Sequence, residues 1–273
     1  MSTAQIALLG AIAGLTIFLG LPVGRIRNPA PRLRAFLNAL SIGVLVFLLW
    51  DVLSHAFAPV EDALVAVTSD HDGSWATFVG LAFVAIAGLT VGLMSLTYYD
   101  GWLSRRAGVP VGAEVSMLWL DTPARRLAFL IAVGIGLHNF SEGLAIGQSA
   151  ASGEVSLALL LIVGFGLHNA TEGFGIVAPL AGDERTPSWG FLGVLGLIGG
   201  GPTFVGTLIG QVYVNEYLFV AFLALAAGSI LYVVMQLLKV GFKLGHREFM
   251  MWGILLGLLA GLATDLVIVA AGA

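Results

Sequence analysis

The sequence GLHNFSEG at positions 136–143 recurs thirty residues later as GLHNATEG at positions 166–173. Over 131–143 and 161–173, eight of thirteen positions are identical. In each copy a histidine precedes a glutamate by four residues, so on a helix the two lie on one face, about a turn apart. An asparagine three residues before the same glutamate lies on its other flank. The repeat therefore predicts two helices that each present an imidazole, an amide and a carboxylate.

The composition of the chain is that of a membrane protein. Of its 273 residues, 58% are hydrophobic and 10% are charged, and the mean hydropathy is +0.98, which is far from the balance of soluble domains. Apolar runs long enough to cross roughly 30 Å of hydrocarbon predict an all-α polytopic fold with eight transmembrane helices in a single domain, residues 1–273. The expected helices cover about 4–24, 35–58, 75–99, 126–150, 155–181, 188–211, 216–238 and 248–271.

The basic residues predict the orientation of these helices. Every Lys and Arg follows the first, third, fifth or seventh expected helix, whereas the other connections carry only acidic charges, such as Glu61 and Asp62. Because cytoplasmic loops are enriched in Lys and Arg, we expect both termini outside the cytoplasm of a multi-pass cell-membrane protein. Membrane topology accounts for the positions of the arginines, so no nucleic-acid partner is expected. The basic residues are Arg25, Arg27, Arg32, Arg34, Arg105, Arg106, Arg125, Arg126, Arg185, Lys239, Lys243 and Arg247.

Both copies of the motif lie near the middle of their expected helices, which a short connection should make antiparallel neighbours. An acidic residue at the bilayer centre costs about 2.5 to 3.5 kcal/mol, so Glu142 and Glu172 need partners. Imidazole and carboxylate ligands suit a divalent cation such as zinc, iron or manganese, and a chain without cysteine offers only N and O ligands. An alternative is a set of polar contacts between helices with protonated glutamates. We expect the repeated glycines to let helices 4 and 5 approach closely.

At these residues the sequence resembles the ZIP (ZRT/IRT-like) family of divalent metal transporters, whose fourth helix carries a motif of the form H-N-x-P-E-G. The resemblance extends to AGLTIFLGLPVG at 13–24 and LALAAGSILYVVMQLL at 223–238. It implies eight helices, termini outside, and elevator-like transport of metal into the cytoplasm, with helices 1, 4, 5 and 6 moving past helices 2, 3, 7 and 8. The implied principal metal site is His138, Glu142 and Glu172, with Asn139, His168 and Asn169 as further ligands or as part of a second site.

The sequence departs from the family pattern in several places. Ser141 and Thr171 replace the usual proline, so local opening of the helices would come from glycine or from hydroxyl bonds to a preceding carbonyl. Gly201 stands before Pro202 where a glutamate is often found, and Asn169 and Gln236 replace acidic residues. These changes predict one metal site in place of a fully acidic binuclear site.

Other polar residues receive separate interpretations. Asp51 and Asp265 lie in the outer halves of their expected helices and are candidates for a metal entrance; the alternatives are an interfacial carboxylate near Trp50 for Asp51 and an end-of-helix charge for Asp265. His55 and the SDHDG segment at 69–73 are expected to be a polar contact and a solvated turn. No phosphate-binding motif occurs, so no ATP-driven step and no cofactor are expected beyond the transported metal, zinc first. We expect no enzyme activity; an intramembrane metalloenzyme, a hydrolase or di-iron protein, is the alternative function, and a proton-conducting bundle is a third. Among protein partners, a second copy of the chain in a homodimer is compatible with the sequence.

Overall fold

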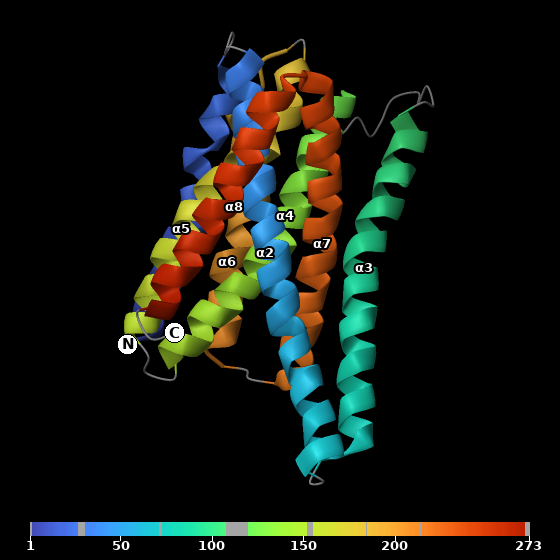
Figure 1. The fold of residues 1–273 in the computed structure, drawn as a ribbon. Coiled ribbons are helices and arrows are strands. Elements are labelled where there is room, and N and C mark those ends of the chain that lie inside the picture. Colours follow the sequence, from blue (N-terminus) through green and yellow to red (C-terminus); the bar gives the residue numbers. More distant parts are fainter. Residues whose placement is uncertain are drawn as a thin grey trace.

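The computed structural model describes residues 2–26, 31–70, 73–107, 120–151, 155–183, 185–212 and 215–270. These residues form eight long helices and contain no strand (Figure 1). The long helices are α1 (Thr3–Leu15), α2 (Pro31–Val65), α3 (Trp75–Ala107), α4 (Pro123–Ala151), α5 (Val155–Val177), α6 (Trp189–Gly210), α7 (Glu216–Leu244) and α8 (Arg247–Ala270). Short helical turns are η1 (Thr16–Leu19), η2 (Leu21–Arg25), η3 (Ala66–Asp70) and η4 (Ala178–Gly182).

The predicted all-α polytopic fold is confirmed. Within the described residues, seven segments are long and apolar enough to cross a membrane, and they cover all or most of every long helix except α5. α5 has 23 residues, which at roughly 1.5 Å per residue also reaches across the hydrocarbon layer. α1 begins and α8 ends at the same end of the bundle (Figure 1), as an even number of crossings requires.

Several helix ends differ from the prediction. The first expected helix is α-helical only to Leu15 and continues as the 3-10 turns η1 and η2, where Pro22 lies in the first turn. α2 runs through Pro59 to Val65, so most of the expected outer connection is helical. α3 likewise continues to Ala107. Hydropathy marks only the part of a helix that suits lipid, whereas helix-forming residues such as Ala63 and Leu64 extend the helix beyond it.

The helices divide into two groups by their packing. The motif bundle consists of α1, α4, α5 and α6, in which α4 packs mainly on α6, and α1 packs on α6 and α5. The frame consists of α2, α3, α7 and α8, in which α2 packs on α8 and α7, and α3 on α7. The two groups meet chiefly where α4 contacts α7 and α2 contacts α5.

The motif glycines do not join α4 to α5, so that expectation is wrong. A Cβ added at Gly143 would collide with the Thr203 carbonyl of α6, and one added at Gly173 would collide with the Ile17 carbonyl of η1. α4 and α5 do contact each other, as predicted for neighbours. The close approach that glycine permits is nevertheless made by each motif helix with a third helix.

Candidate metal centre

Two imidazoles and one carboxylate meet where α4 faces α5. His138 and Glu142 come from α4, with Nε2 of His138 3.0 Å from Oε1 of Glu142. His168 comes from α5, and its Nε2 lies 2.5 Å from the same Oε1. One ligand atom from each of the three residues lies within 4.8 Å of the others, and all three side chains are buried. Among the described residues, this is the group of histidine and acidic side chains arranged to hold a metal ion.

Glu172 lies at the edge of this group. Its Oε1 is 4.0 Å from Nε2 of His138, and its side chain is fully buried. Neither carboxylate oxygen of Glu172, nor Oε2 of Glu142, has a hydrogen-bond partner within the described residues. Buried carboxylate oxygens without partners are costly, so this geometry leaves acceptors that a cation can satisfy.

The two motif asparagines perform the same packing role. Asn139 donates its amide hydrogen to the Gly199 carbonyl of α6 at 3.0 Å, and Asn169 donates to the Ala13 carbonyl of α1 at 3.1 Å. Each amide oxygen remains buried without a hydrogen-bond partner within the described residues. The donated bonds fix the orientation of both amides and leave their oxygens as further potential ligands.

The hydroxyls that replace the family's prolines bond to their own helices. Ser141 donates to the His138 carbonyl at 2.6 Å, and Thr171 donates to the His168 carbonyl at 2.7 Å. These are the hydroxyl bonds to preceding carbonyls that the sequence suggested. Both α4 and α5 nevertheless remain continuous helices across the motif.

α6 lines the bundle with small residues and one hydroxyl. Thr203 is fully buried, its Cβ lies near Gly14, and its hydroxyl has no hydrogen-bond partner within the described residues. Gly201 lines an outward groove with Leu197 and Val205, and a Cβ at position 201 would meet nothing within 4 Å. A side chain at 201 would therefore point away from the histidines. Gly199 and Thr203, which sequence reasoning missed, are among the α6 residues next to the motif.

Two serines of the frame also escaped the sequence analysis. Ser41 of α2 donates to the Thr171 carbonyl at 2.7 Å, next to Glu172 in the chain. Ser229 of α7 donates to the Gly134 carbonyl at 2.9 Å, one turn before His138. A hydroxyl in an apolar run is the signal that could have found them, but the sequence does not show which carbonyl each one reaches.

The candidate entrance residues are not members of the group formed by His138, Glu142 and His168. Asp51 is 28% exposed and lies 3.4 Å from His55, measured from Oδ1 to Nδ1. The seam between α2 and α8 pairs Gly43 with Gly257 and Phe47 with Gly261. One further turn along both helices places Asp51 beside Asp265. Residues 71 and 72 of the SDHDG segment, together with Arg27, lie outside the described residues.

The donor set of the centre suits a divalent transition metal. Imidazole nitrogens and carboxylate oxygens are ligands for zinc and its neighbours, and both must shed protons to bind the ion. The contacts between Glu142 and the two imidazoles are the places where the ion would replace a proton. Gln236, which replaces an acidic residue, is buried in α7 and accepts a hydrogen bond from Lys239 at 3.4 Å.

Comparison with known proteins agrees with this chemistry. The family model described as ZIP zinc transporter matches residues 120–263, which cover more than half of the chain and both copies of the motif. No curated protein matches the chain. The family's members move divalent metals across membranes and are not enzymes. The match over α4 to α8, together with the all-helical membrane fold, shows that the chain belongs to the ZIP family of divalent metal transporters.

Proposed function

We propose that this transporter carries zinc, or a divalent transition metal of similar chemistry, into the cytoplasm. The observation that carries the proposal is the buried convergence of His138, Glu142 and His168, whose ligand atoms lie within 4.8 Å of one another. Three N and O ligands, with a Glu172 oxygen 4.0 Å from the His138 nitrogen as a candidate fourth, match the coordination that zinc prefers. Glu172 supplies a second carboxylate, so the ion's two positive charges are balanced inside the membrane.

The centre favours one metal ion per chain. Asn139 and Asn169 contribute neutral oxygens where a binuclear site would place charged ones, and Gly201 points away from the histidines. Two ions would bring four positive charges to a site with two carboxylates. Their mutual repulsion in a low dielectric would be uncompensated, so the amide oxygens serve as additional ligands to a single ion.

Movement of the motif bundle against the frame is the proposed transport step. The bundle is held together by glycine contacts, such as Gly143 with Thr203 and Gly173 with Ile17, and by the two asparagine bonds. Metal sites near the bilayer midplane are typical of transporters in which one repeat moves against another. The ion would travel with the bundle, because its ligands all come from α4 and α5.

The proposed orientation of the chain in the membrane is based on the charges at its two ends. Arg25, Arg34 and Arg125 gather where α2 and α4 begin, and this end would face the cytoplasm of a cell-membrane protein. Both termini would then lie outside, and Asp51 and Asp265 would stand on the outer side as the metal entrance. Their carboxylates would draw cations toward the centre.

The test is metal uptake into liposomes that contain a metal-sensitive dye. We expect zinc influx with the wild-type protein and its loss with His138→Ala and with the double variant Glu142→Ala/Glu172→Ala. The matched controls are His246→Ala and Glu248→Ala, which remove the same residue types near the α7–α8 turn. Competition with Cd, Mn and Fe(II) ranks the metals.

Three outcomes separate the functions. Influx that only the motif variants abolish supports transport through this centre. Metal bound at the motif without influx would favour an intramembrane metalloenzyme. Unchanged influx in the motif variants would overturn the proposed site.

A further inference from the structure

Thr203 of α6 carries a buried hydroxyl that has no partner in the chain. Its side chain is fully buried, and its Oγ1 has no hydrogen-bond partner within the described residues. A hydroxyl that is buried and unpaired destabilises a fold. Valine has the same shape and would avoid this cost, so packing does not explain why the hydroxyl is there.

This hydroxyl lies on the face of α6 that points into the motif bundle. Gly199 precedes Thr203 by four residues and therefore shares its face of the helix. A Cβ added at Gly199 would contact one isoleucine from each of η1, α4 and α5, namely Ile17, Ile135 and Ile176. Position 203 thus points among the same segments, one turn further along α6.

Thr203 is also level with the metal centre along the axis of the bundle. Its Cβ lies 3.2 Å from the place that a Cβ on Gly14 of α1 would take. Asn169 donates to the carbonyl of the residue just before Gly14 at 3.1 Å. On α4, Gly143 packs against the Thr203 carbonyl and follows the central Glu142 in the chain. Both motif helices therefore reach the layer that contains Thr203.

Apolar side chains close this layer at both ends. At one end are Ile17, Ile135 and Ile176, and at the other are Ala13, Ile146 and Ile162. All six are buried. In α4, Ile135 lies one turn before Asn139, and Ile146 lies one turn after Glu142. A polar atom between these apolar groups does not meet bulk water, so its partner is a molecule or ion that is bound there.

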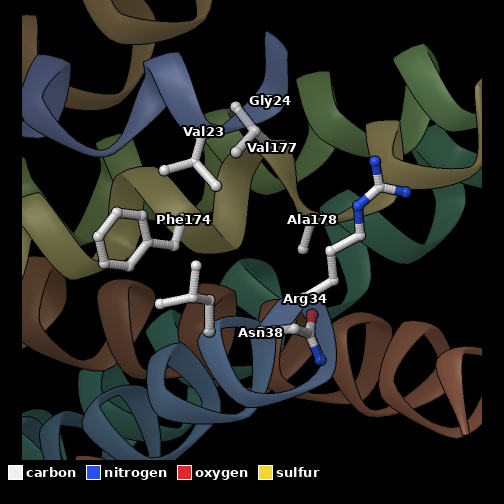
Figure 2. A pocket seen from close by; sticks show the side chains of 8 residues that line it. Val23, Gly24, Arg34, Asn38, Phe174, Val177 and Ala178 are labelled. Atoms are coloured by element: carbon white, nitrogen blue, oxygen red, sulfur yellow. The ribbon is translucent and has the colours of Figure 1, made fainter. Parts of the chain in front are cut away.

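Another unpaired oxygen, on Asn38 of α2, has a different explanation. Asn38 lines the cavity between α2, η2 and the end of α5 (Figure 2), which has a volume of about 30 Å³. A water molecule fits in this volume and can pair with the Asn38 oxygen, which has no partner within the described residues. Thr203 lines neither this cavity nor the groove on the outer side of α6. The partner of Thr203 therefore lies toward the metal centre.

The metal centre offers acceptors to a water molecule held by Thr203. The amide oxygens of Asn139 and Asn169 and both carboxylate oxygens of Glu172 have no hydrogen-bond partner within the described residues. These oxygens accept hydrogen bonds, whereas a threonine hydroxyl can also donate one. A buried water needs two to four polar partners, and the hydroxyl, the unpaired oxygens and a metal ion together supply them.

We propose that Thr203 is a positioning residue for the transported metal and that its hydroxyl holds a water molecule bound to the ion. The water accepts a hydrogen bond from Thr203, binds the ion through its other lone pair and donates to the unpaired oxygens around it. Because α6 belongs to the motif bundle, this water travels with the ion. The inference rests on the proposed function, since it assumes that the ion binds at this centre.

Zinc titration of the purified protein against a competing chelator tests the inference without any transport. Thr203→Val keeps the shape and removes the hydroxyl, whereas Thr203→Ser keeps the hydroxyl. The matched control is Thr207→Val, because Thr207 is equally buried on the same face of α6 but bonds within its own helix, to the Thr203 carbonyl at 2.8 Å. Residues that support a metal ligand are worth about 10- to 100-fold in affinity. We expect about tenfold weaker zinc binding in Thr203→Val and the wild-type affinity in Thr203→Ser and Thr207→Val.

Metal preference separates a water ligand from a packing effect. Water and carboxylate ligands suit manganese, whereas imidazole suits zinc, so Thr203→Val should lower the manganese affinity more than the zinc affinity. Unfolding of each variant without metal is followed alongside, and Thr203→Val should be at least as stable as the wild type, because it loses an unpaired hydroxyl. If Thr203→Val does not fold, Thr203→Ala and Thr203→Ser make the same comparison, since both lack the methyl group and they differ in the hydroxyl.

Several results would overturn the role of Thr203. One is the wild-type affinity for both metals in Thr203→Val, and another is an equal loss for zinc and manganese. Equal losses in Thr203→Val and either Thr203→Ser or Thr207→Val would also do so, because packing along α6 would then be the cause. His138→Ala tests the proposed function separately. If His138→Ala binds zinc as the wild type does, the proposed centre is wrong; if it loses zinc while Thr203→Val retains it, only the role of Thr203 is wrong.

Discussion

The two copies of the motif are alike in how they hold their helices and unlike in how they present their carboxylates. In α4, Asn139 bonds to Gly199 and Gly143 packs on Thr203, four residues further along α6. In α5, Asn169 bonds to Ala13 and Gly173 packs on Ile17, again four residues further along. The repeated asparagine and glycine thus dock each motif helix on a parallel neighbour in the same way.

The glutamates break this equivalence. Glu142 places one oxygen near both imidazoles, at 3.0 Å and 2.5 Å, whereas Glu172 lies 4.0 Å from the nearest imidazole nitrogen. The same motif therefore yields a shared central carboxylate from α4 and a peripheral one from α5. Repetition in the sequence fixes the packing, but the relative placement of α4 and α5 fixes the chemistry.

The largest expected effect comes from exchanging these glutamates for glutamine. Even the residues that only hold a metal ligand in place are worth about 10- to 100-fold in affinity. Glu142→Gln removes the shared carboxylate itself, so it should weaken zinc binding by about 100-fold or more. Glu172→Gln should weaken it by about tenfold. Titration of the purified protein against a competing chelator measures both constants.

The control for the glutamate pair is Glu248→Gln, an exposed residue in the first turn of α8. It should leave the zinc affinity at the wild-type value. Equal losses at 142 and 172 would show that the two carboxylates are equivalent ligands, and the difference between the copies would then vanish when metal binds.

Substitution of the glycine that ends each copy of the motif should destabilise the protein to a similar extent. Gly143→Ala and Gly173→Ala each drive a methyl group into a backbone carbonyl, which cannot move as a side-chain end does. Such overpacking costs about 1 to 3 kcal/mol in the free energy of unfolding, and we expect similar losses for the two variants. The free energy of unfolding in mixed micelles, measured for each variant and the wild type, gives these losses.

Gly201→Ala is the matched control for this pair. A Cβ at 201 meets nothing within 4 Å, and alanine favours a helix over glycine by about 1 kcal/mol. The stability should therefore stay the same or rise slightly. If one motif glycine tolerates alanine and the other does not, the two docking seams are not equivalent.

The number and order of the helices could be predicted from hydropathy, because each span must be apolar over a length that the bilayer sets. The ends of α2 and α3 could not be predicted from hydropathy, because a helix can continue beyond the lipid through any helix-forming stretch. The helices on which the motif glycines pack could not be predicted either. Small residues show that a helix is approached closely, but they do not show by which neighbour.

For the metal centre, the spacing of four residues correctly placed His138 beside Glu142 within one helix. The contact between His168 and Glu142 depends on the rotation of α5 against α4, which no local pattern encodes. Position 201 illustrates the same limit, because the family often has a glutamate before this proline, whereas a side chain at 201 of this α6 would point outward. Whether the six predicted ligands all bind the ion stays a prediction.

The smallest expected effect concerns the serines that bond each copy to the frame. Ser41→Ala and Ser229→Ala each remove a hydroxyl bond to a carbonyl of the motif bundle. Such bonds average about 0.6 kcal/mol in membranes, which corresponds to roughly a threefold change in the balance between two conformations.

The chain has no cysteine, so Val233→Cys can report on the contact between α7 and α4. Val233 is fully buried against Gly134, and a cysteine there should react with a maleimide only when α4 moves away. We expect about threefold faster labelling in either serine variant and none of this increase in Ser54→Ala, whose hydroxyl bonds within its own helix to the Trp50 carbonyl. An increase with Ser229→Ala alone would mean local loosening one turn from the reporter. An increase with Ser41→Ala as well would indicate that the bundle shifts against the frame, because the bond of Ser41 joins α2 to α5 and involves neither α4 nor α7.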